Sequence, residues 1–162
     1  MGSLMTVVHN KKISPARIAG SFDHFKGDGV CLTTRLQGGA TVVAAAGELD
    51  ASNIHHLSDY ARRYLRDGRP VVLDLSELDF LGAQGIRTLL DIDDECVRHK
   101  LDWALVSGRP VSRLLRVCDR DGQLPMASSI EAALQAFSAP WPRTRSAKRR
   151  ERGLLQLVTK SG

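Results

Sequence analysis

The sequence predicts an α/β domain: a mixed, mostly parallel β-sheet of about four to five strands, packed with about four α-helices and opened by an N-terminal β-hairpin. From residue 71 onward, short apolar runs alternate with segments whose apolar residues recur at helical spacing, which is typical of parallel strands joined by crossover helices. Before residue 50, two strand-like runs are separated only by Gln37, Gly38 and Gly39, a turn that favours an antiparallel hairpin.

The first half of the chain supplies the hairpin and one helix. Residues 31–36 and 41–46 are the two strand candidates. A helix follows and ends near Gly68, and either Asp50 or Ser52 is predicted to cap its first turn, because both side chains can accept backbone N–H groups. The buried face of this helix is predicted from the spacing of Ile54, Leu57, Ala61, Tyr64 and Leu65.

The candidate working surface lies where the third strand meets the second helix. Residues 71–75 form an apolar run that favours a strand buried on both faces. From Ile86 the apolar residues follow helical spacing. Residues 81–85 lie between them and contain two glycines, which places Ala83 and Gln84 at the exposed start of the helix. We expect any binding surface of this chain there.

Two further strand and helix pairs complete the predicted body. Residues 103–106 are a strand candidate, and apolar residues between 111 and 118 form one helical face. Residues 123–126 are a short strand candidate, Ser128 can cap the last helix, and residues 130–137 carry its buried stripe.

Length and charge indicate one folded body with tails. The 162 residues suffice for a single domain with an ordinary core. Residues 138–162 hold seven basic side chains and one acidic one, which leaves residues 1–137 with a net charge of −1 out of the total of +5. We expect a flexible arm at residues 1–29, a folded domain at 30–138 and a basic tail at 139–162.

The start of the chain and its hydropathy favour a cytoplasmic protein without a membrane segment. Residues 1–4 have the composition of a cloning remnant before a second start at Met5. No apolar run approaches the roughly 20 residues that span a bilayer, and no signal-peptide core follows the first charges.

No pattern of catalytic or metal-binding residues appears, so neither an enzyme nor a cofactor is predicted. The glycine-rich nucleotide-binding motifs and the Gly-x-Ser-x-Gly elbow are absent. Successive residues of a helix point in different directions, and His55 and His56 have no paired nucleophile. A solvated helix face is therefore predicted for the acidic run Asp91, Asp93, Asp94 and Glu95.

Three cysteines, Cys31, Cys96 and Cys118, are widely spaced and form no CxxC or Cys/His cluster. This pattern favours neither a disulfide framework nor a zinc site. We expect three reduced, largely buried thiols, with a regulatory disulfide as the open alternative.

Three motifs in sequence resemble the STAS domain of bacterial anti-sigma-factor antagonists: residues 47–50 (GELD), 71–76 (VVLDLS) and 79–86 (DFLGAQGI), within a resemblance over roughly residues 30–137. The resemblance implies the STAS fold and a cytoplasmic protein that binds an anti-sigma factor, often a serine/threonine kinase-like protein, and so releases a sigma factor for transcription. The partner-binding residues that it implies are Asp50, Ser52, Leu81, Gly82, Ala83, Gln84, Gly85, Arg87 and Thr88.

The loop departs from the family pattern at the switch position. Placing Gly85 on the family glycine puts Gly82 where an acidic residue is usual and Ala83 where the phosphorylated hydroxyl is usual. A methyl group cannot accept phosphate, so the resemblance implies either constitutive binding or control elsewhere. The open candidates for such control are Thr88, Ser52, Cys31, Cys96 and Cys118, with Thr6 and Ser14 in the arm.

Two other functions stay open at this point. The domain could be a scaffold or assembly subunit whose basic tail contacts nucleic acid or an acidic partner. It could also be a small-ligand or nucleotide sensor, which is disfavoured because residues 82–86 contain no basic side chain. Pairing through the edge of the strand that contains Thr41 is one predicted route to a homodimer.

Overall fold

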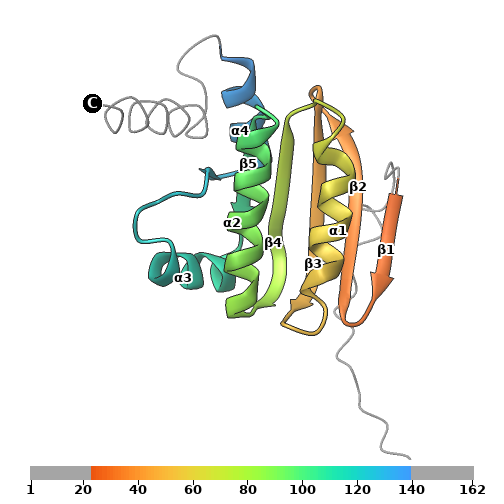
Figure 1. Cartoon of the computed structure of the whole chain (residues 1–162), viewed down its shortest axis with the longest axis vertical. Helices are drawn as coiled ribbons and strands as arrows, with labels where there is room; N and C mark the ends of the chain where they lie inside the picture. Colours follow the sequence, from red (N-terminus) through yellow and green to blue (C-terminus); the bar gives the residue numbers. More distant parts are fainter. Residues whose placement is uncertain (1–22, 140–162) are drawn as a thin grey trace, which may run out of the picture.

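The computed structural model describes residues 23–139, which form a six-stranded mixed sheet in the order β1-β2-β3-β4-β5-β6 with four helices (Figure 1). The strands are β1 (Asp23–Gly27), β2 (Val30–Gln37), β3 (Ala40–Leu49), β4 (Val71–Leu81), β5 (Trp103–Ser107) and β6 (Met126–Ala127). The helices are α1 (Ile54–Leu65), α2 (Ala83–Arg98), α3 (Arg109–Cys118) and α4 (Ile130–Ser138). The predicted α/β class is confirmed, with six strands instead of four to five.

An antiparallel meander opens the sheet, and the remaining pairs are parallel. The predicted β2–β3 hairpin is present, and its turn needs glycine because Gly38 and Gly39 both have positive φ, at 57° and 80°. β1 adds a strand within the predicted arm at residues 1–29, so the folded body begins earlier than residue 30. β1 shows little strand pattern in the sequence, because Phe25 is its one large apolar residue.

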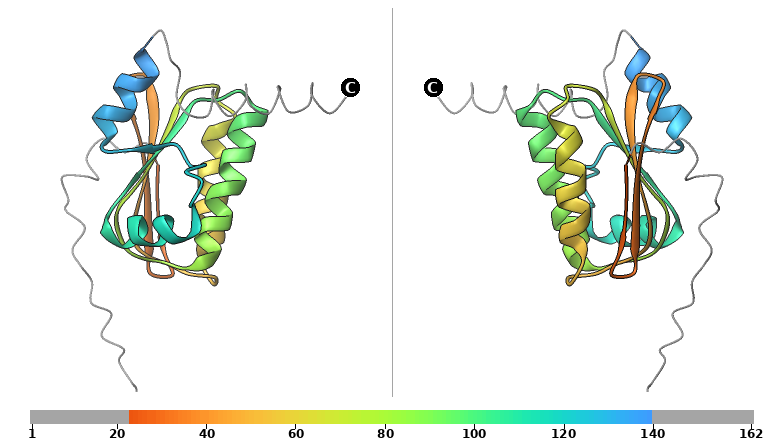
Figure 2. Two further views of the ribbon diagram at one scale, coloured as in Figure 1. Left: turned by 90° about the vertical axis from the view of Figure 1, so that its left-hand side faces the viewer. Right: turned by 90° about the vertical axis from the view of Figure 1, so that its right-hand side faces the viewer.

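The two faces of the sheet carry separate apolar clusters. Figure 2 shows α1 and α2 on one face and α4 on the other. The larger cluster lies under α1 and α2 and includes the fully buried Leu73 and Trp103. The smaller one packs Ala133 of α4 against Val42 and Val72. Burial on both faces explains why the first half of β4 is apolar apart from the buried Asp74.

β4 continues six residues beyond the predicted strand at 71–75 and runs almost directly into α2. Its second half alternates buried Leu78 and Leu81 with exposed Glu77 and Asp79. Polar residues of this kind are typical of loops, which is why the sequence pattern predicts that the strand ends at residue 75. The end of β4 therefore positions Gly82, which directly precedes α2.

Three smaller expectations also need correction. β3 pairs with β2 on one side and with β4 on the other, so dimerisation through the Thr41 strand edge is wrong. The last helix is capped by Ser129 instead of Ser128, since the Ser129 hydroxyl accepts the Ala132 N–H at 3.0 Å. The short strand lies at Met126–Ala127 instead of 123–126. The predicted basic tail falls almost wholly outside the described residues.

Candidate functional site

The carboxyl ends of β3 and β4 bring the two predicted site segments together. Leu49 of β3 is in register with Leu81 of β4, and the Gly82 N–H donates to the Leu49 carbonyl at 2.8 Å. The turn after β3 and the start of α2, thirty residues apart in the sequence, therefore lie side by side. We call their exposed part the Ala83 surface, and its residues are Asp50, Ser52, Phe80, Ala83, Gln84 and Arg87.

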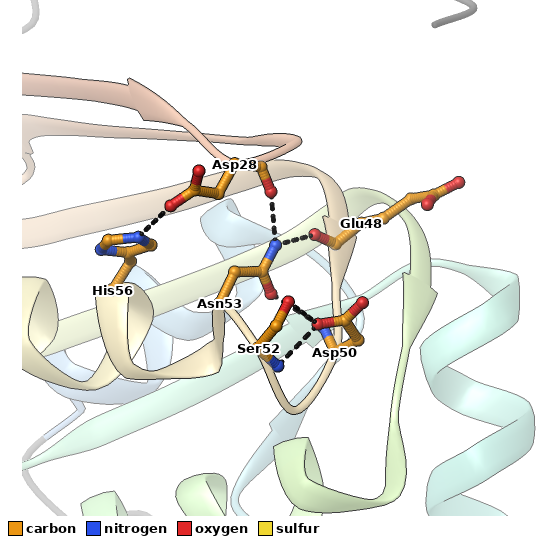
Figure 3. A network of polar contacts seen from close by, with 6 residues as sticks. All are labelled: Asp28, Glu48, Asp50, Ser52, Asn53 and His56. Carbon is orange, nitrogen blue, oxygen red and sulfur yellow. Dashed lines mark hydrogen bonds and ion pairs between the residues drawn. The ribbon is translucent and has the colours of Figure 1, made fainter. Parts of the chain in front are cut away.

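Asp50 shapes the turn at one side of this surface (Figure 3). Its carboxylate accepts the Ser52 backbone N–H at 2.8 Å and the Ser52 hydroxyl at 2.5 Å. The hydrogen bond from the Ser52 hydroxyl, followed by that from its N–H, lowers the pKa of Asp50 below its usual value. The predicted capping role of Asp50 or Ser52 is wrong, because α1 begins at Ile54 with Asn53 as its N-cap residue.

Asn53 holds the turn to the rest of the fold, a role that the sequence analysis missed. Its side-chain amide donates to the carbonyls of Asp28 at 2.7 Å and Glu48 at 2.9 Å, and its oxygen accepts the Asp50 N–H at 2.9 Å. His56 adds a second contact to the same neighbour, with Nε2 2.8 Å from the Asp28 carboxylate. The available signal was an asparagine directly before the apolar period of a helix.

The start of α2 presents little bulk. Gly82 is its N-cap residue in an extended conformation, without a side-chain cap, and no acidic residue stands in the first turn. Ala83 and Gln84 are exposed, as the sequence pattern predicted. The first N–H groups of a helix have no intrahelical acceptor and carry partial positive charge, so this end offers hydrogen-bond donors to a neighbour.

Two predicted partner-binding residues support the junction from inside. Leu81 and Gly85 are both buried. A Cβ on Gly85 would lie 2.2 Å from the Leu81 Cδ1 atom, so any larger residue there would force the Leu81 side chain to move. Phe80, which was not predicted, is half exposed at 50% beside Gly82. It supplies the large apolar group of the Ala83 surface.

Of the candidate regulatory residues within 23–139, Ser52 alone belongs to the Ala83 surface. Ser52 is exposed and hydrogen-bonded to Asp50, whereas Thr88 is half-buried on α2. Cys31 and Cys96 are buried, and burial raises the pKa of the Cys31 thiol. Cys118 is exposed at the end of α3, so the expectation of three largely buried thiols is wrong for it.

The acidic run on α2 is divided between solvent and core. Asp93 is fully buried and accepts the Trp103 indole N–H at 2.9 Å, which corrects the predicted solvated face. Glu95 accepts the Arg62 Nε–H at 2.7 Å and joins α2 to α1. Within residues 23–139, no group of three or more His, Cys, Asp or Glu side chains is arranged to hold a metal ion. None of the helices in that range has the length and apolarity to cross a membrane.

Comparison with known proteins identifies a family match and relatives by sequence. Residues 32–133 match the STAS domain family. Osmosensory protein A of Mycobacterium tuberculosis is 36% identical over 126 residues, which cover 75% of this chain and 76% of that protein. Anti-sigma-F factor antagonist RsfA of the same organism is 32% identical over 122 residues, covering 73% of this chain and 95% of the relative.

Solved structures agree on the fold. An anti-sigma factor antagonist from Mycobacterium paratuberculosis superposes with a TM-score of 0.61 at 23% identity, covering 70% of this chain and 98% of that one. The unphosphorylated anti-sigma factor antagonist SpoIIAA superposes with a TM-score of 0.55 at 14% identity, covering 67% of this chain and 97% of that one. At these identities the likeness concerns the fold alone.

Proposed function

Because the chain belongs to the STAS domain family, we propose that it acts as an anti-sigma-factor antagonist, which binds an anti-sigma factor in the cytoplasm and so frees a sigma factor for transcription. RsfA, a relative by sequence over nearly its whole length, is named an antagonist of anti-sigma-F factor. An anti-sigma factor of the kinase-like class is the partner that the proposal favours. In this proposal the antagonist acts by binding, and the chain needs no catalytic group for that.

The observation that carries the proposal is the Ala83 surface. It combines the N–H groups at the start of α2, the Asp50 carboxylate and the half-exposed Phe80 ring. Its backbone is held by the Gly82–Leu49 hydrogen bond and by the three hydrogen bonds of Asn53. A surface that is already ordered loses little conformational entropy when a partner docks on it.

We also propose that binding is not switched by phosphorylation at the start of α2. Ala83 has no hydroxyl, and the one hydroxyl of the Ala83 surface, that of Ser52, already donates to the Asp50 carboxylate. A phosphate on Ser52 would place about two negative charges against that carboxylate, which opposes the modification. The chain is then competent to bind as synthesised, and control acts on its abundance or at another site.

The test is a calorimetric titration with a panel of purified anti-sigma factors that includes anti-sigma-F factor of Mycobacterium tuberculosis. Ala83→Glu adds bulk and charge at the tip and should weaken the complex at least about tenfold, which corresponds to about 1.4 kcal/mol. A glutamate in the first turn suits the helix dipole, so the variant should stay folded.

The matched control is Ala136→Glu, because Ala136 is exposed on α4, on the other face of the sheet. It should leave the affinity unchanged. If no anti-sigma factor binds the wild-type chain, the proposed function is wrong. If Ala83→Glu binds as tightly as Ala136→Glu, the contact lies away from the Ala83 surface.

A further inference from the structure

One face of α3 carries an arginine stripe. Arg109, Arg113 and Arg116 stand at positions i, i+4 and i+7, and Arg120 follows at i+11 just beyond the helix end. All four side chains are exposed, and Val117, beside the stripe, is 64% exposed. The helix packs on the sheet through its opposite side, where Val111 and Leu115 are buried. We call Arg109, Arg113, Arg116, Val117 and Arg120 the α3 arginine face.

The charges of this face are unfavourable for the isolated domain. Among residues 23–139, no carboxylate lies within 4.0 Å of these four guanidinium groups, whereas Arg62 and Arg63 of α1 reach Glu95 at 2.7 Å and Asp23 at 3.6 Å. Arg109 stands at the positive end of the helix dipole, and the first turn holds no acidic residue to balance it. Like charges four residues apart on a helix also repel each other.

α3 lies at the same end of the molecule as the Ala83 surface. In Figure 1 it stands beside the end of α2 where that helix begins, and the views of Figure 2 agree. The start of α3 packs closely on β4, because a Cβ on Gly108 would lie 2.5 Å from the Ser76 carbonyl oxygen. The hydroxyls of Ser107 and Ser112 also lie within 2.8 Å of each other across its first turn. One partner can therefore cover both surfaces without a change in the fold.

We propose that the α3 arginine face is a second contact region for the anti-sigma factor and binds an acidic patch on that partner, with Val117 against an apolar group. The inference rests on the proposed function and adds the chemistry of the partner. Arginines around an exposed apolar side chain are typical of protein interfaces, where charged groups at the rim speed association. Duplex nucleic acid would use the same charges but would leave Val117 without a counterpart.

The experiment compares two variants with the same change in net charge. Arg113→Glu/Arg116→Glu reverses the charge at the centre of the face, while Arg66→Glu/Arg69→Glu reverses two exposed arginines beyond the end of α1, at the opposite end of the sheet. Association and dissociation rates with the anti-sigma factor that binds the wild-type chain are measured at several salt concentrations. Arg113→Gln/Arg116→Gln removes the charge with little change in size, and thermal unfolding checks that each variant is folded.

We expect the α3 reversal to slow association by roughly tenfold or more at low salt and to flatten its dependence on salt. The reversal at Arg66 and Arg69 should change the rate by less than about threefold, and the glutamine variant should fall between the two. If Arg113→Glu/Arg116→Glu associates as fast as Arg66→Glu/Arg69→Glu, the inference is overturned. The titration with Ala83→Glu tests the proposed function separately. Salt-sensitive binding of duplex DNA through α3, with unchanged binding of the anti-sigma factor, overturns it in favour of nucleic acid.

Discussion

At the scale of single residues, Asn53 joins the segments that support the Ala83 surface. The residue is 4% exposed, and its side chain makes three hydrogen bonds, to Asp28, Glu48 and Asp50. It therefore joins the β1–β2 turn, the end of β3 and the turn before α1 in one contact. The sequence pattern predicts the cap at Asp50 or Ser52 instead, because neighbouring polar residues cannot be ranked until the chain direction after β3 is known.

Asn53→Ala is expected to lower the free energy of unfolding by about 1–3 kcal/mol, because it leaves buried backbone groups without their partners. Ser52→Ala, the control, removes one hydrogen bond at an exposed position and should cost no more than about 0.5 kcal/mol. Urea denaturation followed by circular dichroism measures both. Equal stability of the two variants would contradict the role assigned to Asn53.

Ala83→Ser restores the hydroxyl that the resemblance places at the start of α2. Ala83 is exposed and the added atom is small, so the variant should fold and bind as the wild type does. With ATP and a kinase-competent anti-sigma factor, it should gain phosphate at residue 83 and lose affinity, whereas the wild type gains none between residues 81 and 88. Mass spectrometry locates phosphate in the variant and in the wild type, and calorimetric titration measures the loss of affinity. Stoichiometric phosphate on wild-type Thr88 would contradict the proposed lack of a phosphorylation switch at the start of α2.

At the scale of elements, periodicity predicted the residues that are buried on a regular face of a helix or strand. It missed the exposed residues near the end of a strand. The four helical faces and the buried half of β4 were readable because their apolar residues repeat. The second half of β4 was not, because Glu77, Asp79 and Phe80 are exposed where the strand passes beyond β5 and pairs with β3 alone. Phe80 was missed for the same reason. It lies beyond the predicted strand at 71–75, and a single exposed aromatic residue outside a periodic pattern does not indicate a binding surface.

The positions of the three thiols in their elements predict how they react. Cys31 lies inside β2 and Cys96 on the buried side of α2, whereas Cys118 ends α3 in solvent. Burial also raises the pKa of the Cys31 thiol and so reduces its reactive thiolate. In the native protein, a thiol reagent at pH 8 should modify Cys118 roughly 100-fold faster than the other two, which react through opening of the fold.

Cys118→Ser is the control, since it should abolish the fast phase and leave the slow ones. Rates followed by absorbance, with peptide mapping of the product, identify each site. A fast reaction at Cys31 or Cys96 would show that β2 or α2 opens far more readily than its burial indicates. A disulfide between Cys31 and Cys96 is not expected to form while the native fold persists.

At the scale of the whole molecule, the longest strands lie at the centre of the sheet. β3 and β4 lie in the middle of the sheet, and the strands that lie farther out are shorter or more polar. Strand alternation predicted this mixed architecture, but it could not fix the edges, because edge strands bury too few residues to show a pattern. β1 alternates half-buried and exposed residues over five positions, and β6 has only two residues.

Removal of residues 1–29 tests how much the fold depends on β1. The truncated chain begins where the sequence analysis placed the domain boundary, and it loses the β1–β2 ladder, the Tyr64–Asp23 hydrogen bond and the His56–Asp28 contact. Its free energy of unfolding should fall by at least about 2 kcal/mol, on the basis of roughly 1 kcal/mol for each hydrogen bond lost. The outer edge of β2, with the apolar Val30 and Leu32, then has no strand beside it.

An unpaired apolar edge is a template for another chain, so the truncated protein should form dimers or larger species through β2. Size-exclusion chromatography with light scattering, at equal concentrations of truncated and full-length protein, measures the change. Removal of residues 1–21 is the control, because it keeps β1, so that any difference between the two truncated chains comes from the loss of residues 22–29. A truncation at residue 29 that stays as stable and as small as this control would mean that β1 is dispensable and that the domain begins at β2.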